Sequence, residues 1–233
     1  MIGSPQPEQE AVAHRAAPKF DRLAGVYRWM ERLTFGRCLA RCRFAFLPEL
    51  AASRRALVLG DGDGRFAARL LQANRMVEID AVDASRAMLD ALLRRAGTDA
   101  ARVRASCADA RDWQPGNAQF DLVVSHFFLD CLTSDEASAL AARLRRVVSP
   151  SAVWVISEFT IPQGWYGQLV AAPLVWLLYW AFGVLTGLKV RSLPDHASAL
   201  RRAGFTLEER RTWLHGLLAA EFWRVSSGES GKI

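Results

Sequence analysis

Short apolar runs alternate with amphipathic stretches along most of this chain. Five runs have the length and composition of buried strands; they cover residues 56–59, 77–83, 103–107, 120–126 and 152–157. Final strands are expected near 205–210 and 217–225. Stretches between them, such as 86–95 and 193–203, have helical spacing, and Ser85 is the predicted N-cap of the first. This alternation predicts an α/β fold, in which a mainly parallel sheet is covered by helices on both faces.

Three alternating glycines follow the first run, in the loop Gly60-Asp61-Gly62-Asp63-Gly64, and a helical pattern starts directly after them. Glycine lacks Cβ, so it can take positive φ and let a ligand approach the backbone. A tight turn without a ligand is the alternative. The spacing differs from the G-x-G-x-x-G of dinucleotide sites, and Asp61 and Asp63 would repel a pyrophosphate but suit an ammonium group. The loop therefore favours S-adenosylmethionine over NAD or FAD.

Two further acids follow the second and third runs. Asp83 ends the second run about 20 residues after the glycines, where a βαβ unit places a carboxylate near a ribose. Met88 and Leu89 lie on the inner side of the helix that follows. Asp109, next to Ala110, follows the third run, where its side chain can accept a hydrogen bond from an adenine amino group.

With these anchors the chain resembles the class I S-adenosylmethionine-dependent methyltransferases, from about residue 20 to residue 224. The resemblance implies a Rossmann-like, seven-stranded sheet whose last strand is antiparallel. Residues 20–27 resemble the opening segment of the ubiquinone/menaquinone C-methyltransferase group, which covers the cofactor with N-terminal helices. The family has an acid where this chain has Val58, and another where it has Arg28. The cofactor-binding residues predicted in this way are Tyr27, Gly60, Asp61, Gly62, Asp63, Gly64, Asp83, Ala84, Met88, Asp109, Ala110 and Ser125.

The length of 233 residues fits one enzyme domain. We expect it at 18–225, with an N-terminal helical cover at 18–52, a hydrophobic cap insertion at 160–191, and disordered tails at 1–17 and 226–233. The N-terminus lacks the basic and apolar segments of a secretion signal, which predicts a cytoplasmic location. The four cysteines form no CxxC pair and have no histidine at ligand spacing, so reduced thiols are expected and no metal site.

The formal net charge is +6, and arginines dominate the basic residues. A basic surface attracts nucleic acid or anionic lipid. Here the basic residues are scattered and are not interleaved with aromatic side chains, as they are in single-strand binders. We therefore expect solvated helix faces, and an RNA methyltransferase is the less favoured alternative.

Residues 165–188 carry no charge, and their 24 positions equal the length of a membrane span. A span would separate the strands on either side of it, so we expect a cap over the substrate site. A peripheral membrane contact or a homodimer surface is the first alternative, and a true span is the second. An aromatic cap implies a small apolar acceptor, since each aromatic ring offers a large contact area. The predicted acceptor-binding residues are Trp165, Tyr166, Trp176, Trp180 and His196.

His126 and Asp130 follow the fourth run, at the edge where open α/β sheets bind their ligands. His126 is the candidate general base, because the usual pKa of ~6.5 lies near neutrality, and Asp130 is a second candidate. A histidine that only bonds within a loop is the alternative.

These features predict transfer of a methyl group from S-adenosylmethionine, with S-adenosylhomocysteine as product, to oxygen, carbon or nitrogen of a small apolar, aromatic or quinone-like acceptor. A membrane-associated lipid-modifying methyltransferase and a non-catalytic S-adenosylmethionine-binding module are the alternatives.

Overall fold

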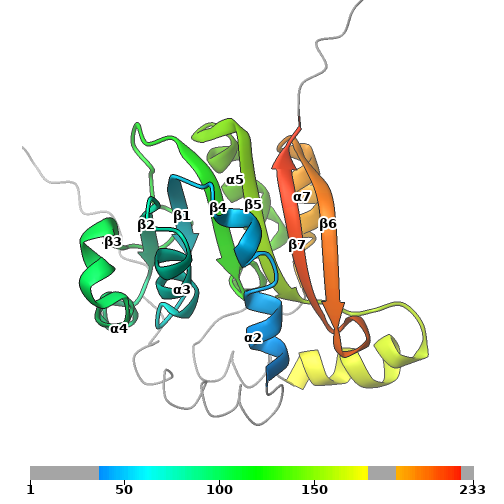
Figure 1. Ribbon diagram of the computed structural model, residues 1–233. Coiled ribbons are helices and arrows are strands. Elements are labelled where there is room, and N and C mark those ends of the chain that lie inside the picture. Colours follow the sequence, from blue (N-terminus) through cyan, green and yellow to red (C-terminus); the bar gives the residue numbers. More distant parts are fainter. Residues whose placement is uncertain (1–36, 178–192, 227–233) are drawn as a thin grey trace, which may run out of the picture.

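The computed structural model describes residues 37–177 and 193–226. They form a seven-stranded sheet in the order β3-β2-β1-β4-β5-β7-β6 (Figure 1). Strands β1 to β5 pair in parallel, and β7 is antiparallel to both of its neighbours, β5 and β6, so that six strands share one direction. The strands are β1 (Arg55–Leu59), β2 (Glu78–Asp83), β3 (Val103–Cys107), β4 (Phe120–His126), β5 (Val148–Phe159), β6 (Phe205–Trp213) and β7 (Leu218–Val225). The predicted fold class is confirmed.

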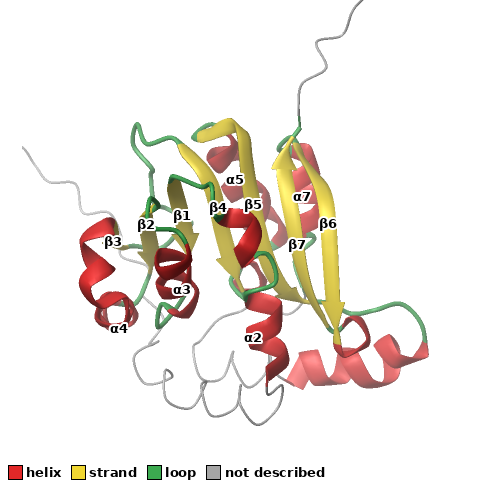
Figure 2. Ribbon diagram, in the orientation of Figure 1, coloured by secondary structure: helices red, strands yellow, loops and turns green. Residues whose placement is uncertain are grey.

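Helices cover both faces of this sheet (Figure 2). The α-helices are α2 (Arg37–Arg43), α3 (Arg65–Ala73), α4 (Arg86–Ala96), α5 (Ser134–Arg145) and α7 (His196–Arg202). Short turns are labelled η2 (Leu47–Leu50), η3 (Gly97–Arg102), η4 (Leu129–Cys131), η5 (Gly167–Ala171) and η6 (Leu214–Gly216). In Figure 1, α2 and α3 lie in front of the sheet, and α5 and α7 lie behind it.

The sheet divides the apolar core into two layers. The front layer joins Phe66 and Leu70 of α3 to residues of α2, α4 and β7. The back layer packs Leu140 of α5 and Leu200 of α7 on Trp154 of β5. Alternate residues of each strand face opposite sides of a sheet, so the central strands are apolar on both sides and read as continuous apolar runs.

Several local predictions agree with the structure. The side chain of Ser85 accepts a hydrogen bond from the amide of Met88, as an N-cap does. The crossover helix predicted over 193–203 is shorter, because Asp195 caps α7 and accepts from Ser198 N. β5 begins four residues earlier than expected and contains Pro150.

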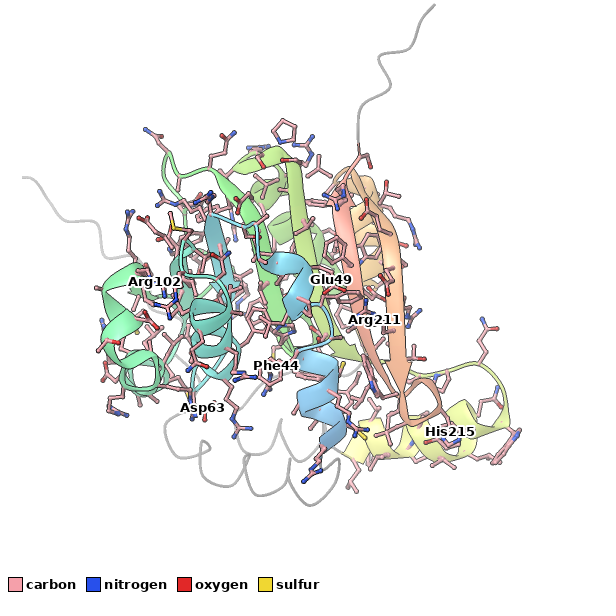
Figure 3. All side chains as sticks on the ribbon, viewed as in Figure 1. Phe44, Glu49, Asp63, Arg102, Arg211 and His215 are labelled. Carbon is pink, nitrogen blue, oxygen red and sulfur yellow. The ribbon has the colours of Figure 1, made fainter. Side chains whose placement is uncertain are left out.

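The described part of the N-terminal cover lies against the sheet. Leu39 and Leu50 are buried in the front core layer. Arg211 of β6 pairs with Glu49 at 2.8 Å, and its guanidinium lies 4.3 Å from the centre of the Phe46 ring. Figure 3 shows Glu49 and Arg211 at neighbouring positions. Residues 37–50 are therefore tied to β6 by charge as well as by apolar packing.

Some predicted features lie outside the described residues. They are the tail 1–17, the first part of the cover with Tyr27, the later part of the cap insertion with Trp180, and residues 227–233 of the C-terminal tail. Within the described ranges, none of the helices combines the length and the apolar character that crossing a membrane requires.

Candidate functional site

The glycine loop connects β1 to α3, at the edge where the parallel strands end. All three glycines have positive φ, of 63°, 59° and 76° for Gly60, Gly62 and Gly64. Their surroundings differ. A Cβ on Gly60 would lie 2.4 Å from the ring of Phe128, and one on Gly64 would lie 2.5 Å from Leu92 of α4. Two of the glycines therefore serve close packing within the protein.

Gly62 is the one loop glycine with open space beside it. A Cβ there would meet no described atom closer than the Met88 sulfur, at 4.0 Å. The amide of Gly62 also donates a hydrogen bond to the Asp83 carboxylate. Gly62 thus leaves its backbone open next to the Asp83 carboxylate. This arrangement suits a bound nucleoside, which needs close approach to the backbone and an acceptor for its ribose hydroxyls.

Asp83 ends β2 and is held in a fixed orientation. Its Oδ1 accepts from Ser85 N at 2.8 Å. Burial raises the pKa of Asp83, and the two amide hydrogen bonds only partly offset that increase. Among the described residues, no cation contributes to this balance. A ribose diol would donate hydrogen bonds to this carboxylate and so favour its charged form.

The two acids inside the loop are engaged by the protein. The carboxylate of Asp61 accepts from Phe66 N at 3.3 Å and Ala67 N at 2.8 Å, in the first turn of α3. Burial raises its pKa to about 6, against the lowering effects of Arg43 and of the two amides. Asp63 pairs with Arg95 at 2.8 Å and with Arg65 at 3.2 Å. Figure 3 shows Asp63 at the lower edge of the molecule. The expectation that these acids face the ammonium group of a ligand is therefore not supported by their contacts.

Asp109 follows β3 and is bound by Arg111. The Nε atom of Arg111 lies 2.9 Å from both carboxylate oxygens, and Arg111 also pairs with Glu136 of α5 at 3.2 Å. Ala110, beside it, is buried in the back core layer. An adenine amino group that bonds to Asp109 would share the carboxylate with the guanidinium of Arg111. The contact between Asp109 and adenine stays a prediction.

Ser125 does not reach this edge with its side chain. It is fully buried, and its hydroxyl accepts a hydrogen bond from Trp154 Nε1 at 2.9 Å. Because β4 is apolar on both faces, its sequence does not indicate on which face of the sheet the Ser125 side chain lies.

His126 is the last residue of β4, and it is only 4% exposed. Its Nδ1 lies 2.8 Å from Ser157 Oγ, and that hydroxyl donates to the carbonyl of Cys42 at 3.2 Å. A hydroxyl has one proton, so Nδ1 of His126 carries the proton and donates it to Ser157. Nε2 then carries a lone pair, and it has no hydrogen-bond partner among the described residues.

The surroundings of His126 keep it neutral. Burial, and next the charge of Arg43, hold its pKa well below the usual range. The ring packs edge-on against Phe66, with centroids 4.5 Å apart. His126 is therefore a neutral acceptor under an apolar cover, and its part as a general base stays a prediction.

The loop after β4 is held by an acid at the end of β5. Phe127 takes a positive φ of 54°, which turns the chain away from the strand. Glu158 of β5 then accepts from Phe128 N at 3.1 Å and Leu129 N at 2.8 Å, at the start of η4. Asp130 lies in this turn. The only local sign of Glu158 is an acid at the end of an apolar run.

The described cap residues differ in their exposure. Trp165 and Trp176 are 72% and 64% exposed. The ring of Tyr166 lies 5.2 Å from that of His215 in the turn between β6 and β7, and Figure 3 shows His215 there. Ala171 and Val175 are buried on the inner side of this helical segment. That Trp165, Tyr166 and Trp176 line the acceptor site stays a prediction, and the apolar sequence of this segment does not mark which side faces inward.

His196 starts α7 behind the sheet. Its Nε2 lies 3.0 Å from Glu221 of β7, which also accepts from Trp223 Nε1 at 2.9 Å. Its predicted contact with the acceptor stays a prediction. Within the described ranges, no three histidine, cysteine or acidic side chains gather as a metal site.

Comparisons with known proteins agree with this geometry. Residues 56–151 match the family described as a methyltransferase domain. No curated protein shows a significant match. Among solved structures, the mitomycin 7-O-methyltransferase MmcR has a TM-score of 0.66 at 15% identity, over 89% of this chain and 60% of that one. An O-methyltransferase family protein from Burkholderia thailandensis has a TM-score of 0.65 at 21% identity, over 92% of this chain and 64% of that one.

A third similar structure is the CcbJ methyltransferase from Streptomyces caelestis, with a TM-score of 0.61 at 20% identity, over 80% of this chain and 90% of that one. The chain thus spans less than two thirds of the length of the first two structures. Residues 56–151 are similar to the methyltransferase domain family, and the described chain shares the fold of these solved methyltransferases.

Proposed function

We propose that this protein transfers a methyl group from S-adenosylmethionine to a hydroxyl oxygen of a small apolar acceptor. The observation that carries the proposal is the pairing of Gly62, which leaves space beside the backbone, with the buried carboxylate of Asp83. The similar structures named as O-methyltransferases support oxygen as the acceptor atom. Carbon and nitrogen acceptors remain alternatives.

When bound, the cofactor supplies a methyl group on a sulfonium, which is already a good electrophile. The chain then has to hold the two reactants in line and keep water away. Gly62 and Asp83 would hold the adenosine part. A hydroxyl acceptor also has to lose a proton, and the lone pair on His126 Nε2 is suited to accept it once the cover over the ring opens.

The quinone-like acceptor rests on the sequence alone, because the segment that resembles the ubiquinone/menaquinone group lies outside the described residues. A non-catalytic binding module is the alternative, since the chain has Val58 where the family has an acid. Incubation with methyl-labelled S-adenosylmethionine and a panel of apolar phenols and quinols separates the two. We expect labelled, solvent-extractable product together with S-adenosylhomocysteine. Tight cofactor binding without transfer to any member of the panel would favour the binding module.

A second candidate function is methylation at a membrane surface. Residues 161–177 hold six of the seven large apolar side chains that are exposed among the described residues: Ile161, Trp165, Leu169, Val170, Trp176 and Leu177. This exposed face contains no charged residue, and Lys189 and Arg191 follow it in sequence. Apolar and aromatic side chains near basic ones are typical of helices that lie on anionic lipid. The net charge of +6 favours the same partner.

Sedimentation with phospholipid vesicles tests this candidate. We expect the chain to bind vesicles that contain phosphatidylglycerol more strongly than neutral ones, and we expect the double change Trp165→Ser, Trp176→Ser to abolish binding. Met76→Ser, which removes the seventh exposed apolar side chain, should leave binding unchanged. A wild-type dimer in solution that the same double change dissociates, without vesicle binding, would identify a dimer surface instead.

A further inference from the structure

The hydroxyl of Ser157 lies between the last strand residue of β4 and the end of α2. Ser157 belongs to β5 and is fully buried, and its Oγ lies 2.8 Å from Nδ1 of His126. The same hydroxyl donates to the backbone carbonyl of Cys42, the second-last residue of α2, at 3.2 Å. Ser157 therefore links the described part of the N-terminal cover to the candidate base.

The capacity of this hydroxyl determines the direction of each hydrogen bond. A serine hydroxyl has one proton and two acceptor lone pairs. The carbonyl oxygen of Cys42 can only accept, so it receives the hydroxyl proton. Burial raises the pKa of the Cys42 thiol to about 12, so the thiol keeps its proton and donates to Ser157. The remaining lone pair accepts from Nδ1–H of His126, and the hydroxyl is then fully used.

The opposite tautomer of His126 would disrupt this arrangement. A proton on Nε2 would be a buried donor, and no described residue accepts a hydrogen bond at that atom. Nδ1 would then need the hydroxyl proton of Ser157, and the carbonyl of Cys42 would lose its hydrogen bond to that hydroxyl. Buried N–H groups without an acceptor are rarer in proteins than acceptors that are not fully used. The network therefore favours the Nδ1–H tautomer.

Other residues at the end of α2 also act on His126. Phe44 directly follows α2 and stacks on Phe66, with ring centroids 6.2 Å apart, and Phe66 packs against the imidazole of His126 (Figure 3). The charge of Arg43 is, after burial, the second cause of the low pKa of His126. The surroundings and the hydrogen bonding of His126 thus both depend on α2.

We infer that Ser157 is a positioning residue for the methyl transfer, which joins the Cys42 carbonyl of α2 to His126 and keeps the ring as the Nδ1–H tautomer. Nε2 is then the atom that accepts the proton of the acceptor hydroxyl. The inference rests on the proposed function, because it assumes that His126 is the base.

The bonds of the transfer balance in this arrangement. The hydroxyl proton of the acceptor moves to Nε2 of His126, the acceptor oxygen bonds to the methyl carbon, and the electron pair of the broken carbon–sulfur bond stays on sulfur. Ser157 continues to accept from Nδ1–H when the ring is charged. Since the Cys42 carbonyl belongs to α2, His126 is held in this tautomer while α2 lies on the sheet.

Two-bond ¹H–¹⁵N NMR correlation spectra of the full chain, labelled at histidine, measure which ring nitrogen is protonated. Comparison with His126→Gln identifies the signals of His126 among the four histidines. We expect the wild-type ring to be protonated at Nδ1 alone. Ser157→Ala removes the acceptor of that proton, so part of the population should change to the Nε2–H tautomer. The same variant should lower kcat by ~5- to 10-fold while KM changes by less than about twofold.

Ser138→Ala is the matched control, because the Ser138 hydroxyl has the same kinds of bonds far from His126. It donates to the carbonyl of Ser134 at 2.7 Å and accepts from Arg202 Nη2 at 2.9 Å. This variant should leave the His126 signals, kcat and KM unchanged.

A wild-type ring protonated at Nε2 would overturn the inference, and this spectrum decides even if Ser157→Ala does not fold. A folded Ser157→Ala variant with the wild-type tautomer and kcat would overturn it as well. So would a changed tautomer with unchanged kcat, since Ser157 would then act on a residue that the reaction does not use. A wild-type chain that methylates no acceptor would instead contradict the proposed function, and the spectra would still show whether Ser157 holds the ring.

Discussion

Replacing Asp83 by asparagine tests the assignment of the ribose contact. Asp83 is largely buried, has no cationic partner in the part of the chain that the structure describes, and accepts from Ser85 N at 2.8 Å and from Gly62 N. Asparagine keeps one oxygen for these amides but loses the charge and half of the acceptor capacity. A hydrogen bond to a charged group contributes ~1.5–3 kcal/mol. Loss of one such bond to the ribose predicts ~10- to 150-fold weaker binding of S-adenosylhomocysteine.

Calorimetric titration measures that affinity, and thermal melting shows whether the variant is folded. Asp80→Asn is the control, since Asp80 lies on the same strand but pairs with Arg55 at 3.1 Å; its affinity should be unchanged. Since burial raises the pKa of Asp83, wild-type affinity should also fall as the pH drops through that pKa, whereas Asp83→Asn should show no such dependence. An unchanged affinity in a folded Asp83→Asn variant would refute the assignment.

Three further changes probe other residues of the site. Gly64→Ala should lower the free energy of unfolding by ~2–5 kcal/mol, because its Cβ would lie 2.5 Å from Leu92. Gly62→Ala should cost only ~1–2 kcal/mol of backbone strain, but it should weaken cofactor binding. Thermal melting and calorimetric titration compare the two variants, and equal stability losses would contradict the difference in free space beside the two glycines. Burial raises the pKa of Asp61 to about 6, which adds about 3 kcal/mol of stability below pH ~4, and this stability is lost as the pH rises through about 6. Asp61→Asn should flatten this part of the stability profile in denaturant titrations. An unaltered profile would assign the titration to another group. If His126 is the general base, His126→Ala should reduce turnover by ~10²- to 10⁴-fold with nearly unchanged cofactor affinity. Steady-state kinetics measure the turnover. Activity within a few fold of wild type would show that His126 is only a structural residue.

The fold could be predicted from sequence because its signals are local. Apolar runs marked the strands, and the alternating glycines with Ser85 marked the turns into α3 and α4. The contacts of the site were harder to predict because they join distant positions. Glu158 binds amides about 30 residues away, and Ser157 links His126 to Cys42 across three elements. No local pattern encodes such pairs.

Asp61 and the apolar segment 165–177 show two further reasons why the site could not be predicted in full from the sequence. Asp61 lies just before α3, and capping of the helix competes with ligand binding as an explanation for the same residue. Trp165 and Trp176 belong to a helix that is apolar on every side, so periodicity could not distinguish the inner face from the exposed one. In both cases the residue type was informative, but the sequence did not indicate which way the side chain points.

The central claim is that the glycine loop and Asp83 bind S-adenosylmethionine. Calorimetric titration of the purified wild-type chain with S-adenosylhomocysteine, and in parallel with NAD, tests it most directly. We expect saturable binding of one S-adenosylhomocysteine per chain and no measurable binding of NAD. Tight binding of NAD with no response to S-adenosylhomocysteine would contradict it.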